Sequence, residues 1–143
     1  MILLDAMVLS ELCRARPNPG VVAYLKSQPA DTVFLSAMTL GEIEAGIEIQ
    51  RSVAPDFAAV LAQWLTLMEL QFAPFILPVT PAIAKLRGRL CVQTGNKGID
   101  NLIAATALFH NLMVVTRNVK DFEPTGVRVF DPFGLPEAAG VAG

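Results

Sequence analysis

Four acidic residues of this 143-residue chain, Asp5, Glu42, Asp100 and Asp121, lie beside segments expected to be strand ends or helix starts. Asp5 is the least expected of them, because it directly follows the apolar run "ILL". Burying a lone carboxylate is costly unless something pairs with it. A divalent cation is one such partner, and oxygen ligands without His or Cys suit Mg²⁺ or Mn²⁺. Acid clusters that hold these ions hydrolyse phosphodiesters by in-line water attack.

Each acid also has a purely structural explanation. Asp5 could cap the helix that follows it, and Glu42 has the Thr-x-x-Glu spacing of a capping box with Thr39. Asp100 could favour a helix dipole, and Asp121 could close a turn after the preceding strand. Taken singly these explanations are the better ones, whereas the four positions taken together favour a shared site.

The elements that must position these acids alternate along the chain. Proline and glycine mark the starts and ends of several expected helices. The pattern predicts strands over 2–4, 32–37, 75–79, 112–116 and 127–130, and helices over 8–15, 20–28, 39–51, 55–72, 81–95 and 99–111, with a turn over 117–122. Strands separated by helices imply right-handed crossovers and an α/β fold with a mostly parallel sheet.

All strands of a parallel sheet run in the same direction, so residues that follow different strands lie at the same end of the sheet. Ligands bind beyond the carboxyl ends of its strands. Asp5 and the residues after Thr116 should therefore lie at one end of the sheet. Short helices that start there could bring Glu42 and Asp100 to the same place, where neighbouring carboxylates repel each other unless a cation is present.

Composition limits the other function classes. Hydrophobic residues make up 53% of the chain, which we attribute to a sheet buried on both faces and to an apolar subunit interface. The apolar stretch 102–115 is interrupted by His110 and Asn111, and it is shorter than the roughly 20 residues that a bilayer requires. No signal-peptide pattern opens the chain. We therefore expect a cytoplasmic protein without a membrane association.

Charge gives no evidence for nucleic-acid binding. The formal net charge is −2, so the chain lacks the basic character of most nucleic-acid-binding domains. Two small basic groups are more simply explained as solvated helix faces than as a phosphate groove: Lys85, Arg87, Arg89 and Lys97, and Arg14 with Arg16.

Four stretches resemble the successive motifs of one known family. They are "LLDAMVLSEL", "LSAMTLGEIEAGI", "GIDNLIAATALFHNLMVVTRNVKDF" and "VRVFDPF". In order and spacing they resemble PIN-domain ribonucleases, specifically the VapC-type toxins of bacterial toxin–antitoxin pairs. The resemblance extends from Ile2 to about Phe133, so we expect a PIN domain over 1–133 and a flexible tail over 134–143.

The resemblance implies a fold, an activity and partners. The fold would be a PIN-like three-layer α/β/α sandwich, and the activity a Mg²⁺- or Mn²⁺-dependent endoribonuclease. The partners would be an RNA substrate, a cognate antitoxin and a second copy in a homodimer. The family's acids fall on Asp5, Glu42, Asp100 and Asp121, of which Asp5, Asp100 and Asp121 would bind the metal, with Thr116 and Asn118 as supporting polar residues.

The first motif departs from the family's pattern. The family has Asp-Thr-Asn or Asp-x-Ser where this chain has Asp5-Ala6-Met7. The usual hydroxyl and amide hydrogen-bond neighbouring carboxylates, and losing such supports typically costs about 10–100-fold in metal affinity or activity. Either Thr116, Asn118 or water replaces these bonds, or the activity is weakened. Glu11, farther along the same motif, is expected to face solvent.

Two other functions stay open. A PIN-like domain that has lost catalysis could persist as a binding or regulatory module, which the Ala6-Met7 pair would explain. A receiver-type signalling domain also carries acids and Mg²⁺ at strand ends. It fits poorly, because it needs paired acids after the first strand and a lysine after the last.

Overall fold

The computed structural model describes residues 1–136, which form a five-stranded sheet flanked by helices. Every neighbouring pair of strands is parallel, and their order is β3-β2-β1-β4-β5. The strands are β1 (Ile2–Leu4), β2 (Val33–Ser36), β3 (Ile76–Leu77), β4 (Met113–Val115) and β5 (Val129–Phe130). The N-terminal strand is therefore the centre of the sheet, and the predicted α/β fold with a parallel sheet is confirmed.

Seven α-helices connect and cover the strands within the described residues. They are α1 (Ala6–Glu11), α2 (Pro19–Lys26), α3 (Ala37–Val53), α4 (Pro55–Gln71), α5 (Pro81–Thr94), α6 (Asp100–His110) and α7 (Val119–Phe122). Proline opens α2, α4 and α5, where its missing N–H costs nothing. The predicted stop of α5 at Gly95 is confirmed, with a left-handed φ of 72° that glycine adopts without strain.

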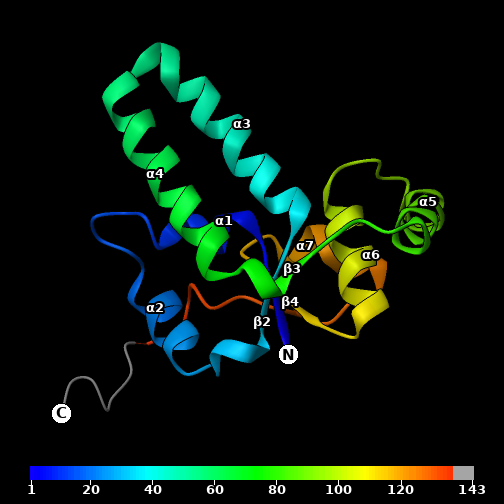
Figure 1. Cartoon of the computed structure of the whole chain (residues 1–143). Coiled ribbons are helices and arrows are strands. Elements are labelled where there is room, and N and C mark those ends of the chain that lie inside the picture. The colour runs from blue at the N-terminus through cyan, green and yellow to red at the C-terminus, as the bar shows by residue number, and fades with distance from the viewer. Residues whose placement is uncertain (137–143) are drawn as a thin grey trace.

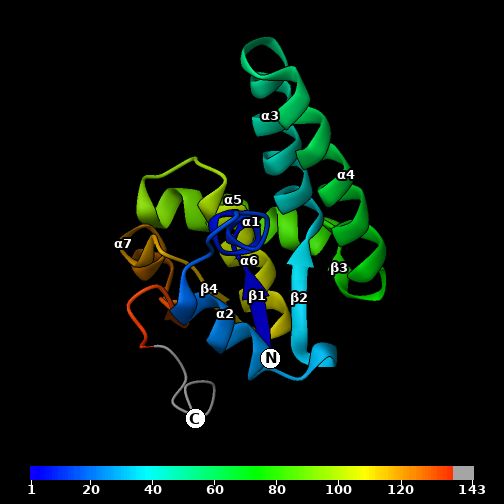
Figure 2. The same ribbon diagram turned by 90° about the vertical axis from the view of Figure 1, so that its left-hand side faces the viewer.

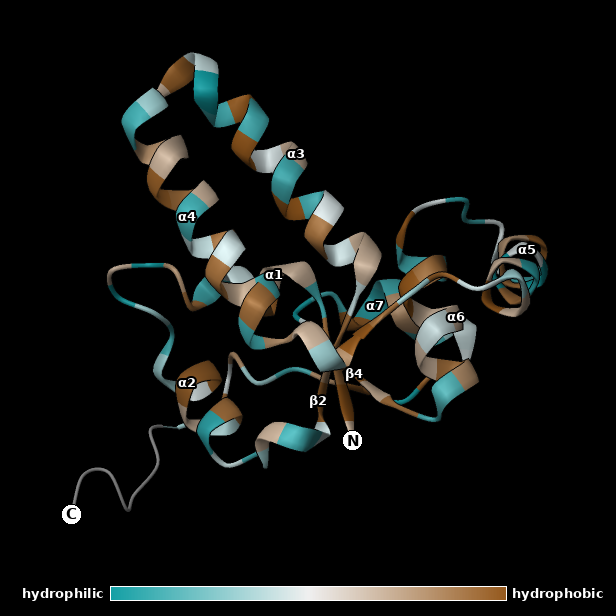
Figure 3. Ribbon diagram, viewed as in Figure 1, coloured by the Kyte–Doolittle hydropathy of each residue, from teal (hydrophilic) through white to brown (hydrophobic). Residues whose placement is uncertain are grey.

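The sheet separates two layers of helices (Figure 1). On one face Leu3 packs with residues of α5, α6 and α7. On the other face its neighbours Ile2 and Leu4 pack with residues of α1 and α2. Because successive side chains of a strand point to opposite faces, a strand that is apolar throughout is buried on both. Figure 3 shows this as unbroken brown along the central strands, and the three-layer prediction is confirmed.

Helices α3 and α4 form a long antiparallel hairpin that extends beyond the sheet (Figure 2). The hairpin has a small core of its own, made by Ile47, Ala58 and Leu65. Its base rests on the sheet through Leu40 and Trp64, which pack against the core on the α1 side. The hairpin is thus a continuation of the helical layer that carries α1 and α2.

Several predicted boundaries were wrong. The first helix begins at Ala6 instead of residue 8, because Asp5 caps it directly. The stretch expected to be only a turn contains the short helix α7 and a 3₁₀ turn, Glu123–Thr125. The first strand has its predicted bounds, 2–4, whereas the other four are shorter than their apolar patterns, down to two residues at each sheet edge.

Two further predictions concern membrane association and the C-terminal tail. No helix of the described residues is long and apolar enough to span a membrane. Of the predicted tail, 134–136 are described, and the carbonyl oxygen of Leu135 lies against Gly20. Residues 137–143 lie outside the described part of the chain.

Candidate active site

Asp5 occupies the carboxyl end of the central strand β1 and is only 4% exposed. Its Oδ1 accepts a hydrogen bond of 2.9 Å from the N–H of Ala6, and its Oδ2 accepts one of 2.8 Å from the hydroxyl of Thr116. Burial raises the pKa of Asp5, its two hydrogen bonds lower it, and the charge of Asp121 raises it further. The capping role is confirmed, but capping uses one carboxylate oxygen and explains neither the burial nor the second hydrogen bond.

Thr116 and Asn118 form a chain of contacts that reaches the first motif. The backbone N–H of Asn118 donates to Thr116 Oγ1 at 3.0 Å, so this hydroxyl is fixed while it donates to Asp5. The side-chain amide of Asn118 donates to the sulfur of Met7 at 3.2 Å. Of the two side chains that could replace the missing polar pair, Thr116 is thus the one that hydrogen-bonds to the Asp5 carboxylate.

Glu42 lies in the second turn of α3, not in the first as expected. The helix begins at Ala37, and its cap is Ser36, whose Oγ accepts from the N–H of Met38 at 3.1 Å. The proposed capping box of Thr39 with Glu42 is therefore wrong. Glu42 Oε1 is instead buried without a hydrogen-bond partner among the described residues. Its pKa is raised to about 7 by burial first and by the charges of Asp5 and Asp100.

Asp100 is the first residue of α6, where no side chain caps the helix. Burial raises its pKa, and so do the charges of Asp5 and Asp121. Asp121 lies on α7 and is exposed. Its N–H donates to the carbonyl oxygen of Asn118 at 3.0 Å, which is the turn expected there.

These electrostatic links join all four predicted acids. Asp5 and Asp100 raise the pKa of Glu42, and Asp121 raises the pKa of both Asp5 and Asp100. An exclusively acidic oxygen donor set of this kind fits a hard divalent cation, and the unpartnered Glu42 Oε1 is an acceptor still available to a ligand or water. Residues 1–136 contain no group of three or more His, Cys, Asp or Glu side chains already arranged to hold a metal ion.

Glu11 is a structural residue that the sequence did not identify as buried. It was expected to face solvent, yet it is 7% exposed. Its Oε1 accepts from the backbone N–H of Asn18 at 2.8 Å, and its Oε2 is 3.4 Å from Arg14 Nη1. Glu11 therefore ties the loop between α1 and α2 to the helix that starts at Asp5. The available signal was weak, namely the spacing of three residues that places Glu11 on the same face of the helix as Val8.

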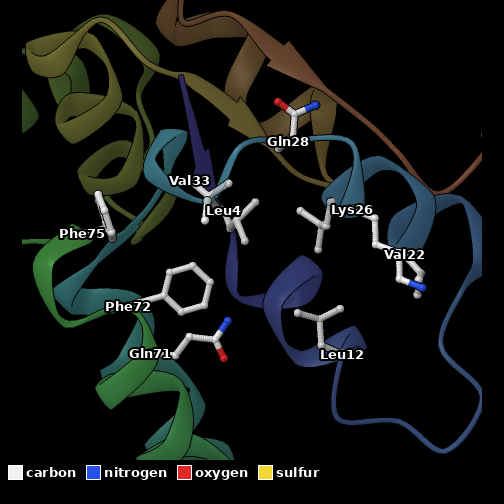
Figure 4. Close-up of a pocket in the computed structure, with 11 residues that line it drawn as sticks. Leu4, Leu12, Val22, Lys26, Gln28, Val33, Gln71, Phe72 and Phe75 are labelled. Carbon is white, nitrogen blue, oxygen red and sulfur yellow. The ribbon is translucent and has the colours of Figure 1, made fainter.

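Two hollows flank α1. One is a groove of about 510 Å³ between α1 and the α3–α4 hairpin, and Glu42 and Met7 are among its lining residues. The other, of about 340 Å³, lies toward α2 and contains no carboxylate (Figure 4). Phe72 and Leu4 line this second, apolar pocket. Of the two hollows, only the first is lined by one of the four candidate acids, Glu42.

Comparison with known proteins identifies the family of this arrangement. The family model described as "PIN domain" matches residues 2–125. This chain belongs to the PIN-domain family. The predicted resemblance to PIN-domain toxins of the VapC type is confirmed.

Individual relatives cover almost the whole chain. Toxin FitB of Neisseria gonorrhoeae is 35% identical, over 93% of this chain and 99% of its own. The crystal structure of FitAcB from the same organism has a TM-score of 0.84 at 35% identity, over 94% of this chain and 100% of that one. VapC ribonuclease Y4jK of Sinorhizobium fredii is 32% identical over 93% and 98%. A toxin–antitoxin complex from Klebsiella pneumoniae has a TM-score of 0.71 at 25% identity, over 94% and 100%.

Proposed function

We propose that this chain is a Mg²⁺- or Mn²⁺-dependent endoribonuclease and the toxin of a toxin–antitoxin pair. The observation that carries the proposal is the mutual repulsion of the four acids in a PIN-family chain. Packing like charges together is unfavourable in the absence of a cation, so a purely structural role would not explain it. A relative named a ribonuclease and another named a toxin support the activity and its context.

Asp5, Asp100 and Asp121 are the residues that would hold the cation. Asp5 is fixed through both carboxylate oxygens, by Ala6 and by Thr116, which is the preorganisation that a ligand needs. When bound, the ion would lower the pKa of a water molecule and neutralise charge on the phosphate. Its charge would also lower the cost of keeping these carboxylates ionised side by side.

Glu42 is suited to move a proton. Its pKa of about 7 lies where a general base is most effective at neutral pH. Its Oε1 is buried without a hydrogen-bond partner among the described residues, so the protein leaves this acceptor position unused. The water oxygen would form a new P–O bond while the P–O bond to the departing strand breaks, and the departing oxygen would take up a proton.

The alternative is a catalytically weakened PIN-like binding module, which the Ala6-Met7 pair motivates. The hydrogen bond from Thr116 to Asp5 favours activity over that alternative. It supplies a donor to the carboxylate without the usual polar pair. We therefore propose metal-dependent cleavage at a reduced rate.

The partners follow from relatives and from exposed apolar residues. The Klebsiella pneumoniae relative was solved as a toxin–antitoxin complex, which supports an antitoxin as partner of this chain. Val60, Leu67 and Leu70 are at least 60% exposed along α4, which supports a homodimer that covers them.

The test is cleavage of end-labelled RNA from several classes by the purified chain, with Mn²⁺ or with EDTA. We expect cleavage only with Mn²⁺, and a loss of at least about 100-fold in Asp100→Asn. The matched control is Asp56→Asn, since Asp56 is exposed in the first turn of α4 and should not matter. Bound Mn²⁺ without cleavage of any RNA class would favour the binding-module alternative.

A further inference from the structure

We propose that Arg117 binds a phosphate of single-stranded RNA beside the cleavage site, and that the ring of Phe133 holds its guanidinium in place. This inference rests on the proposed ribonuclease function and names a substrate-binding residue for it. It starts from the groove between α1 and the α3–α4 hairpin, which Glu42 and Arg117 line together. A strand that lies in this groove beside Glu42 would therefore lie near Arg117 as well.

The backbone on either side of Arg117 is fixed by the site itself. Thr116 donates to Asp5, and the N–H of Asn118 donates back to Thr116 Oγ1. The backbone position of Arg117 is therefore fixed relative to Asp5, one of the candidate metal ligands. Its guanidinium carbon lies 4.7 Å from the centre of the Phe133 ring, which is within cation–π range.

The position of Phe133 is itself fixed by its contacts, so its ring is a defined surface on which the guanidinium stacks. The N–H of Phe133 donates to Asp131 Oδ1 at 2.8 Å, and its ring packs against the core on the α1 side. Stacking on a fixed ring restricts the arginine while leaving its N–H donors accessible at the edge. That geometry suits bidentate binding of phosphate, which lysine cannot imitate.

The side-chain donors of Arg117 have no partner among residues 1–136. Among residues 1–136, ion pairs involve only Arg14 with Glu11 and Arg51 with Glu48, and no hydrogen bond of the Arg117 side chain occurs there. An exposed arginine beside a cluster of acids, yet paired with none of them, is available to an incoming anion.

The groove has the other features of a single-strand channel. Phe57 and Trp64 line it together with Phe133, and Arg14 adds a second, partly neutralised cation. Aromatic side chains combined with positive charge bind single strands by stacking and by phosphate contacts. A peptide of a partner protein is the competing occupant, and the test below separates the two.

The binding test avoids cleavage altogether. A fluorescein-labelled 12-nucleotide single-stranded RNA of mixed sequence is titrated with the full chain in EDTA at 50–300 mM salt, and anisotropy gives Kd. We expect Arg117→Gln to weaken binding by about tenfold and to reduce the slope of log K against log salt by about 0.7. Arg117→Lys should keep the slope but recover only part of the affinity.

Two variants make the test specific. Arg128→Gln removes the same charge at the opposite end of the strands, where Arg128 precedes β5 and donates to the carbonyl oxygen of Asn111, and should change Kd less than twofold. Phe133→Leu leaves the charge but frees the guanidinium, so we expect weakening of about two- to fivefold with an unchanged salt slope.

The outcomes distinguish this inference from the proposed function. Equal binding by Arg117→Gln and Arg128→Gln, or no RNA binding by the unaltered chain at 50 mM salt, would overturn the role of Arg117. If Arg117→Gln binds RNA as tightly as the unaltered chain but binds a peptide partner more weakly, the groove would be a binding site for a partner protein instead. Arg117-dependent binding without Mn²⁺-dependent cleavage would leave the inference standing and refute the nuclease proposal.

Discussion

Replacing Glu42 with glutamine should stabilise the metal-free protein at pH 8 and do much less at pH 5. The pKa of this carboxyl is raised from 4.5 to about 7 in the folded chain. Between these values the folded state binds more protons than the unfolded state, so stability falls as pH rises. The stability that the protonated Glu42 carboxyl contributes is fully present below pH 4.5. It has been lost once the pH passes 7, where the ionised carboxylate is repelled by its neighbours.

The magnitude follows from the size of the rise in pKa. At about 1.36 kcal/mol per pKa unit, a rise from 4.5 to 7 corresponds to roughly 3.4 kcal/mol. Glu42 is only half-buried, so solvent screening should reduce the measured effect to about 1–2 kcal/mol. For a chain of this size that is a rise in Tm of about 3–6 °C.

The assay is thermal unfolding in EDTA at pH 5 and pH 8, followed by circular dichroism. The control is Glu44→Gln, an exposed acid on the same helix, which should change stability by less than about 0.5 kcal/mol at either pH. A lower Tm for Glu42→Gln than for the unaltered chain at pH 8, or an equal gain at both pH values, would refute electrostatic repulsion as the cause. Asp100→Asn should likewise stabilise the metal-free protein at pH 8, because burial and the charges of Asp5 and Asp121 raise the pKa of Asp100, and it should lose the Tm increase that Mn²⁺ gives the unaltered chain.

Three further changes test the supports of the site and of the fold. Thr116→Val should destabilise the chain by about 1–3 kcal/mol in urea unfolding, because a buried carboxylate loses its hydroxyl donor; unchanged stability would mean that water replaces the bond. Ala6→Thr with Met7→Asn should raise Mn²⁺ affinity by about 10-fold or more in calorimetry, and equal affinity at matched folded fraction would show that the present bonds already suffice. Gly20→Ala should cost about 1–3 kcal/mol, since the added Cβ would lie 2.6 Å from two backbone carbonyl oxygens. Gly41→Ala, whose Cβ meets nothing within 4 Å, is its control, and equal melting of the two variants would contradict the steric argument.

The sheet was predictable from sequence because burial on both faces leaves a clear trace. An unbroken apolar run such as Ile2–Leu4 fits few elements other than a central parallel strand, and the helices between such runs fix the crossovers. The other four strands were predicted too long because buried residues also lie beyond the ends of the paired segments. In 127–130, Val127 is buried before β5 begins at Val129.

The candidate acids could be found from strand ends, but their local partners could not. Whether Thr39 and Glu42 form a capping box depends on where the helix starts. The sequence around Thr39 did not reveal that Ser36, three residues earlier, caps α3. The bond between Thr116 and Asp5 joins residues 111 positions apart, and no local pattern indicates it. Glu11 was misassigned for a related reason, since its burial depends on the path of the loop that returns to Asn18.

The central place of β1 has a consequence for the order in which this protein can be completed during its synthesis. β1 pairs with β2 on one side, but its other edge is filled only by β4 at Met113–Val115. A ribosome that has made the first hundred residues has therefore produced a sheet with an open edge at its centre, and an Asp5 whose hydroxyl donor does not yet exist. Chains released early should be open to proteases and should lack the complete set of acids. The proposed site would then have all four of its acids only when translation has passed Asp121.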